Sequence, residues 1–195
     1  MKRVFFICAF FLGINFSYAS NELSQQATAF YSDYYFQKTM ELILQIDEKE
    51  RSAQDWLLLG NLLDEKGEKQ NAIIMNQKAI NTEEKYYKAY YNLANINLAD
   101  GKNNIAIENY KKALKYTKNN PYVHYNLACA YINMAEIKKA KSELIKAVTL
   151  NSNIPEVHYN LAYVYKCLNK PKLAQDYLNN YNKLVNELKK ITFCW

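Results

Sequence analysis

The feature that most constrains this chain is a hexapeptide that recurs at a fixed distance. The letters VHYNLA occupy residues 123–128 and again, unchanged, residues 157–162, and the related AYYNLA occupies residues 89–94. Successive copies lie 34 residues apart. A period of this length indicates one supersecondary unit used several times, because each unit buries its apolar face only by packing against its neighbours. The chain of 195 residues is therefore expected to form a short array of stacked repeats.

Whole columns of residues agree when the chain is aligned at this spacing. Three columns lie early in each unit: Trp56, Tyr90, His124 and His158; Leu59, Leu93, Leu127 and Leu161; Gly60, Ala94, Ala128 and Ala162. Two later columns hold small residues: Ala72, Ala106, Ala140 and Ala174; then Ala79, Ala113, Ala147 and, as an exception, Tyr181. Within a unit the apolar residues recur at helical intervals. Small side chains at fixed positions let a neighbouring helix approach closely.

Each unit also contains a break between its two halves, at Gly67, Gly101, Ala135 and Asn169. Glycine and asparagine tolerate the left-handed backbone conformation that ends a helix, so a tight helix–turn–helix is predicted. Alanine is a weaker stop, and a slightly different turn is expected at Ala135. Only four glycines and three prolines occur in the chain, which favours helices over a turn-rich β-fold.

This pattern resembles the tetratricopeptide repeat (TPR) family, whose signature is W-x2-L-G-x2-Y followed by A-x3-F. Trp56, Leu59 and Gly60 match the opening of that signature, and Ala106 and Tyr110 match its second block. The proline that ends the family's repeat is missing from its usual place. The resemblance covers the chain from residue 53 to about residue 188. It implies an all-α fold, a right-handed superhelical array of helix–turn–helix repeats with capping helices at both ends.

The organisation expected from the repeat follows from these boundaries. A degenerate N-terminal repeat or cap is assigned to residues 20–52, and four TPR units to residues 53–86, 87–120, 121–154 and 155–188. Residues 189–195 are interpreted as the end of a C-terminal capping helix, because apolar residues alternate by four and three along this part of the chain. The alternative is that the same stripe is a seam for self-association, which would give a homo-oligomer.

The N-terminus reads as a secretory signal over residues 1–19. Lys2 and Arg3 form a basic start, an apolar run covers residues 4–16, and small residues precede Ser20, where cleavage is expected. The apolar run is too short for a membrane span, so no stable span is expected after cleavage. The chain is predicted to be exported, periplasmic or secreted, with a bacterial envelope as the setting. Two of the six net positive charges belong to the signal, and the rest are too few to indicate nucleic acid binding.

The resemblance also implies where a ligand would bind. In the TPR family the first helices of successive units line a concave groove that holds a protein or peptide. Carried over to this sequence, the groove candidates are Leu57, Asn61, Tyr91, Asn92, Asn95, Tyr125, Asn126, Tyr159, Asn160 and Tyr163. Asparagine offers both a donor and an acceptor to a peptide backbone, and tyrosine offers a rigid apolar face with a polar tip. The alternative is that these residues only fill the repeat's consensus.

No catalytic or cofactor pattern accompanies the repeat. The sequence has no glycine-rich phosphate loop, no nucleophile elbow and no HExxH zinc pattern. His124 and His158 form a pair without nearby carboxylate ligands in sequence, so no metal site is predicted. The sequence therefore indicates a non-catalytic protein-binding scaffold of the cell envelope or secretory pathway, without a cofactor. A self-associating structural adaptor and an accessory subunit of an envelope enzyme complex remain as alternatives.

Overall fold

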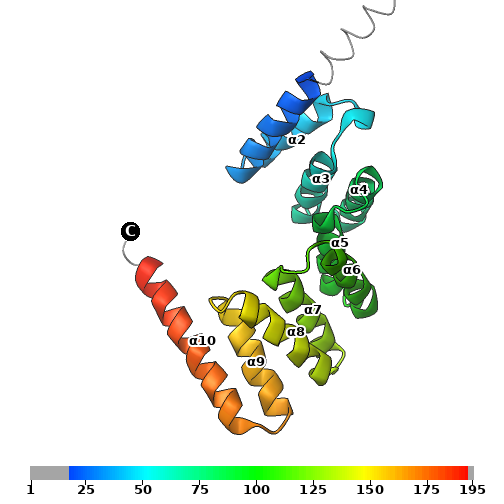
Figure 1. Cartoon of the computed structure of the whole chain (residues 1–195). Coiled ribbons are helices and arrows are strands. Elements are labelled where there is room, and N and C mark those ends of the chain that lie inside the picture. Colours follow the sequence, from blue (N-terminus) through cyan, green and yellow to red (C-terminus); the bar gives the residue numbers. More distant parts are fainter. Residues whose placement is uncertain (1–17, 193–195) are drawn as a thin grey trace, which may run out of the picture. The chain divides into compact units, whose positions relative to one another are not determined.

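The computed structural model describes residues 18–192, and no β-strand occurs in this part of the chain (Figure 1). This confirms the all-α prediction. The first 17 residues of the predicted signal and the last three residues of the chain lie outside the described residues. A helix over residues 18–32 is followed by α2 (Phe36–Gln45), the short 3-10 helix η1 (Glu48–Glu50), α3 (Ala53–Glu65), α4 (Lys69–Thr82), α5 (Tyr87–Ala99), α6 (Asn103–Tyr116), α7 (Pro121–Asn133), α8 (Ile137–Leu150), α9 (Pro155–Cys167) and α10 (Pro171–Thr192).

The chain divides into two compact units, one up to Ala89 and one from Tyr90 onwards. In the first unit, α3 begins with a capping box, in which the Ser52 side chain accepts from the backbone N–H of Asp55. The Asp55 carboxylate in turn accepts from the backbone N–H of Ser52, at 2.8 Å. The same carboxylate accepts from Ser24 at 2.7 Å, which fastens the helix over residues 18–32 to α3. Two otherwise unpaired helix-start donors are thereby satisfied.

The second unit alternates first helices (α5, α7 and α9) with second helices (α6, α8 and α10). The predicted small columns lie in its core: Ala106, Ala113, Ala140 and Ala147 are completely buried. Because each of these positions has only a methyl group, a neighbouring helix packs close to the backbone there. In this unit α7 packs against α6, and α9 packs against α8.

The turn inside each helix pair has one geometry throughout, so the prediction of a different turn at Ala135 is wrong. Ala135 adopts φ 56° and Asn169 adopts φ 54°, beside φ 71° at Gly101. The Ala135 N–H donates to the Ile132 carbonyl at 2.9 Å, and the equivalent Gly101 N–H donates to Leu98 at 3.0 Å. The surrounding hydrogen bonds impose the left-handed conformation, although an alanine side chain disfavours it by about 1–2 kcal/mol.

The last helix is longer than the other second helices of its unit. α10 has 22 residues, against 14 in α6 and in α8, and residues 189–192 continue it without a break. Of the residues 189–195 assigned to the end of a capping helix, those that the structure describes are therefore the last turn of α10 itself. Among the described residues, no helix is both long and apolar enough to cross a membrane.

Candidate interaction face on the first helices

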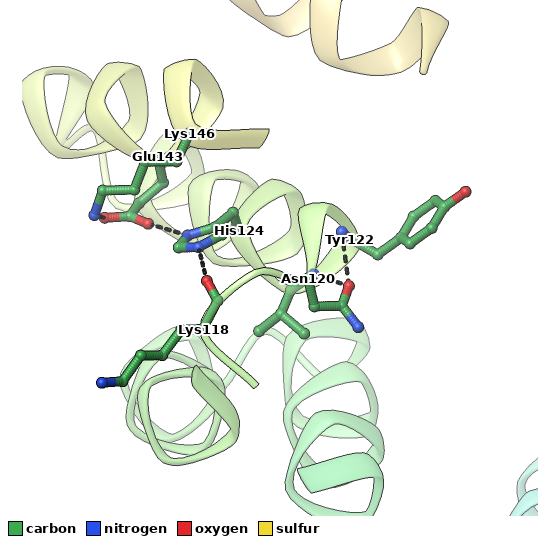
Figure 2. A network of polar contacts seen from close by, with 7 residues as sticks. Lys118, Asn120, Tyr122, His124, Glu143 and Lys146 are labelled. Atoms are coloured by element: carbon green, nitrogen blue, oxygen red, sulfur yellow. Dashed lines mark hydrogen bonds and ion pairs between the residues drawn. The ribbon is translucent and has the colours of Figure 1, made fainter. Parts of the chain in front are cut away.

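The predicted groove residues of the second unit lie on its three first helices, and we call this surface the first-helix face. It comprises Tyr91, Asn92 and Asn95 on α5, Tyr125, Asn126 and Cys129 on α7, and Tyr159, Asn160 and Tyr163 on α9. The starts of α7 and α9 are fixed by proline at the first helical position. The Asn120 side chain also caps α7, accepting from the backbone N–H groups of Tyr122 at 3.0 Å and Val123 at 3.3 Å (Figure 2).

A hydrogen-bonded amide connects α7 to α5 on this face. The Asn126 side-chain amide donates to the Tyr91 hydroxyl at 2.8 Å and to the Asn95 side-chain oxygen at 3.1 Å. Tyr110 of α6 donates to the same Asn95 oxygen at 2.6 Å. Burial raises the pKa of the Tyr91 and Tyr110 hydroxyls, so both stay protonated. The N–H groups of Asn126 are thus used within the chain, between α7 and α5.

A second amide connects α9 to α7 in the equivalent place. Asn160 donates to the Cys129 sulfur at 3.4 Å and is also hydrogen bonded to Tyr125. Burial raises the pKa of the Cys129 thiol, so the unreactive thiol form is favoured over the thiolate. The asparagine column is therefore a ladder that joins successive first helices. The sequence interpretation, in which these amides serve a bound peptide, did not include this structural use.

The tyrosines supply the exposed part of the face. Tyr159 is 54% exposed and Tyr163 is 47% exposed, whereas Tyr91 and Tyr125 are half-buried. Tyr122, at the start of α7, is 53% exposed and points away from the helix (Figure 2). It was not among the predicted residues, although its position three residues before Tyr125 puts it on the same side of the helix.

The two predicted residues of the first unit have different surroundings. Leu57 is only 5% exposed and belongs to the core of that unit. Asn61 is half-buried and hydrogen bonded to Tyr31. Leu57 thus offers almost no surface to a ligand, and the face described above is built from residues of the second unit alone.

His124 lies at the centre of a separate polar network (Figure 2). Its Nε2 faces the Lys118 carbonyl at 3.1 Å, and its Nδ1 faces the Glu143 carboxylate at 2.6 Å. A carbonyl only accepts, so Nε2 carries a proton and donates it to Lys118, and Nδ1 is the ring nitrogen that meets the Glu143 carboxylate. Burial alone would raise the pKa of Glu143, but hydrogen bonds from His124 and Lys146 outweigh it and leave that pKa below its usual value.

This network joins three segments of the second unit. The His124–Glu143 pair joins α7 to α8, and the Lys118 carbonyl joins His124 to the loop that follows α6. Both ring nitrogens of His124 are occupied, so neither has a lone pair for a metal. Among the described residues, no group of three His, Cys, Asp or Glu side chains is placed to hold a metal ion.

A pocket of about 460 Å³ opens at the last repeat, between α9 and α10. It is lined by Tyr159, Ala162, Tyr163, Lys166, Pro171, Ala174, Gln175 and Leu178. Two of the predicted residues, Tyr159 and Tyr163, therefore belong both to the first-helix face and to this pocket.

Comparison with known families agrees with this geometry. The TPR repeat family matches residues 95–134, and the tetratricopeptide repeat family matches residues 121–154. The chain contains tetratricopeptide repeats. A TPR fold is in general a non-catalytic scaffold for protein interaction, with the ligand on the surface formed by its stacked repeats. No curated protein matches the TPR chain in sequence.

Several solved structures share the fold of the TPR chain. "MamA 41-end from Desulfovibrio magneticus RS-1" is 15% identical with a TM-score of 0.74, covering 87% of this chain and 96% of the other. "Crystal structure of MamA" is 17% identical with a TM-score of 0.73, covering 84% and 96%. "MamA RS-1 ArsTM double mutant" is 14% identical with a TM-score of 0.75, covering 88% and 97%. At this level of identity the likeness concerns the fold.

Proposed function

We propose that this chain is an exported, non-catalytic scaffold that holds a partner polypeptide against its first-helix face. The observation that carries the proposal is the combination of an internally bonded asparagine ladder with projecting tyrosine rings. The ladder fixes the spacing of α5, α7 and α9, so the rings are presented by a rigid support. Rigid aromatic side chains give a large contact area at a small cost in conformational entropy.

The binding site is best tested by site-specific photo-crosslinking. A benzophenone amino acid would replace Tyr122 on the first-helix face or, as the control, Ile105 on the second helix α6, which is similarly exposed at 47%. After irradiation with an envelope fraction of the source cells, a discrete adduct is expected for Tyr122 and none for Ile105. Equal labelling at both positions would mean that the first-helix face is not the ligand site.

Export rests on the N-terminal sequence, and it has its own test. Residues 1–24 fused to an alkaline phosphatase that is active only outside the cytoplasm should give active enzyme in a bacterial host. Placing two carboxylates in the apolar run, as Phe6→Asp with Phe10→Asp, should abolish that activity because a charged segment no longer engages the export machinery. Equal activity of both fusions would contradict a signal function.

A further inference from the structure

The interface between successive repeats is built twice in the second unit with the same parts. The first helix of the next repeat packs against the second helix of the repeat before it, α7 on α6 and α9 on α8, and reaches the first helix of that repeat through one asparagine. In the third repeat, whose second helix α8 packs against α9, the small and apolar residues Ala128, Ala140 and Leu144 are completely buried. Each covering helix adds one amide: Asn126 donates to Tyr91 and Asn95, and Asn160 donates to Cys129 and is hydrogen bonded to Tyr125.

The fourth repeat presents the same columns without a covering helix. The residues at the equivalent places are Ala162, Ala174 and Leu178, which line the pocket together with Tyr159 and Tyr163. Ala174 and Leu178 are partly exposed, unlike their buried counterparts in the third repeat. Within residues 18–192 no further helix follows α10, so the amide that would face Tyr159 and Tyr163 is not supplied by this part of the chain.

The orientation of a covering helix can be taken from the interface already formed. Asn133, at the end of α7, donates to Asn103, at the start of α6, at 3.2 Å. The C-terminal end of a covering helix therefore lies beside the start of the second helix that it covers. On the fourth repeat, the part of the surface beside the start of α10 is basic. Lys166 lines the pocket there, and the exposed Lys170 and Lys172 flank Pro171. Lysines at this end favour the negative end of a helix dipole and acidic side chains.

The stripe required of an occupant is also defined by α9. The completely buried residues of α9 include Val157, Leu161 and Val164, and Asn160, which reaches Cys129 of the third repeat, lies between them in the sequence. The first helix of a second copy does not offer such a stripe. The helix over residues 18–32 already buries Ala27, and its exposed side carries Glu22, Gln25 and Gln26. A head-to-tail copy would place these polar groups against an apolar pocket without partners.

We propose that the α9–α10 face binds an amphipathic helix of a partner protein that runs parallel to α9. The helix has apolar residues at positions i, i+4 and i+7, an asparagine at i+3 that reaches Tyr159 and Tyr163, and acidic residues at its C-terminal end. The binding extends the repeat interface of this chain by one helix. It uses the pocket between α9 and α10, which shares Tyr159 and Tyr163 with the first-helix face but is otherwise lined by residues outside that face.

The probe is a fluorescent peptide that copies the covering helix itself. It has the sequence of residues 154–168, IPEVHYNLAYVYKCL, with Lys166→Glu to make its end acidic and Cys167→Ser to prevent oxidation. Binding to the full chain is followed by fluorescence anisotropy. In the protein, Ala174→Arg fills the pocket and should weaken binding of the peptide at least tenfold. The matched control is Leu173→Arg, because Leu173 is 39% exposed and lies outside the pocket. This control should leave binding of the peptide unchanged. Circular dichroism checks that both variants keep their helices.

Two further changes test the orientation of the bound peptide and its central hydrogen bond, and both leave the core of the protein unaltered. Lys166→Glu in the protein should weaken binding of the acidic peptide about fivefold. A peptide that retains its own Lys166 should restore the affinity for this variant. Asn160→Ala in the peptide should weaken binding about fivefold, because one buried hydrogen bond is lost.

Three outcomes overturn the inference. The first is no binding of the peptide by the unmodified protein at millimolar concentration, and the second is equal weakening by Ala174→Arg and Leu173→Arg. The third is a dimer in light scattering that Ala174→Arg converts to a monomer, because the occupant would then be a second copy. Weakening by Tyr122→Ala but not by Ala174→Arg would place the peptide on the first-helix face, which contradicts this inference and leaves the proposed function intact.

Discussion

The third and fourth repeats begin their first helices with the same six residues, yet their histidines have different surroundings. His124 uses both ring nitrogens, one on the Glu143 carboxylate and one on a backbone carbonyl. His158 donates from Nε2 to the Ser152 carbonyl at 2.7 Å, and its buried Nδ1 has no hydrogen-bond partner within the described part of the chain. Tyr177 takes the place of Glu143, with its ring centre 5.9 Å from that of His158.

This difference shows that the hexapeptide determines where the histidine lies but not what it does. Its first bond, to a carbonyl six residues earlier, is the same in both repeats. The second bond depends on one residue in the following helix, Glu143 in the third repeat and Tyr177 in the fourth. A hydrogen-bonded histidine–glutamate pair in the third repeat thus corresponds to an aromatic contact in the fourth. The two repeats are a natural matched pair, and the same substitution in each gives different expected results.

The largest difference is expected from replacing each histidine with phenylalanine. His124→Phe leaves the Glu143 carboxylate with Lys146 as its remaining ionic partner and should cost about 3 kcal/mol of unfolding free energy. His158→Phe removes a single hydrogen bond to a carbonyl and should cost about 1 kcal/mol. Urea unfolding followed by circular dichroism measures both values. Equal losses would mean that the Glu143 pair adds nothing to the stability of the third repeat.

The next largest difference concerns how closely each repeat is covered. Ala140 is completely buried on α8, which packs against both α7 and α9, so Ala140→Leu should overpack the core of the third repeat and cost about 2 kcal/mol. Ala174 occupies the same column in the open pocket, where Ala174→Leu should change stability by less than about 0.5 kcal/mol. Thermal unfolding of the two variants makes the comparison directly. A large loss at Ala174 would show that the fourth repeat is covered as tightly as the third.

The sequence alone was enough to predict the structural features that recur in every repeat. The helices, the buried alanine columns and the turn positions recur every 34 residues, and a periodic signal of that kind distinguishes helix pairs from other folds. The TPR resemblance then gave the faces of the helices, because helical spacing puts residues such as Tyr125 and Asn126 on one side.

Features that occur once, or that depend on partners in space, were not predictable in this way. Glu143 lies 19 residues after His124 and has no counterpart in the other repeats, so the period does not reveal their pairing. The bonds of Asn126 to Tyr91 and Asn95 cross between repeats, and the sequence gives no distance between those side chains. At Ala135, local propensity argued against the turn, but the hydrogen bonds of the whole helix pair outweigh it.

Lowering the pH should reduce the extra stability that Glu143 gives the third repeat relative to the fourth. The pKa of Glu143 in the folded chain lies below its ordinary value of 4.5, because its hydrogen bonds from His124 and Lys146 outweigh the effect of burial. The ionised carboxylate of Glu143 therefore stabilises the fold fully above its ordinary pKa of 4.5. This stabilisation is lost as the pH falls through the lower pKa of the folded chain. Glu143→Gln should cost about 1.5 kcal/mol at pH 7, and the cost should shrink as the pH falls below 4.5.

The control for this pH dependence is the equivalent position of the fourth repeat. Tyr177→Phe removes a hydroxyl that does not titrate in acid, so its effect on stability should be constant between about pH 3 and pH 7. Unfolding by urea at several pH values gives both curves. A cost of Glu143→Gln that stays constant over the same range would contradict the ionic account of the third repeat.

The smallest difference is expected at the turns between the two helices of each repeat. Ala135 and Asn169 adopt nearly the same positive φ, but asparagine tolerates the left-handed conformation better than alanine does. Ala135→Gly should therefore raise the free energy of unfolding by about 1 kcal/mol, whereas Asn169→Gly should change it by only a few tenths, roughly 0.3 kcal/mol. Gly101→Ala provides the reverse test, with an expected loss of about 1 kcal/mol. A gain at Asn169 as large as that at Ala135 would show that the benefit comes from glycine's flexibility in the turn rather than from relief of strain at Ala135.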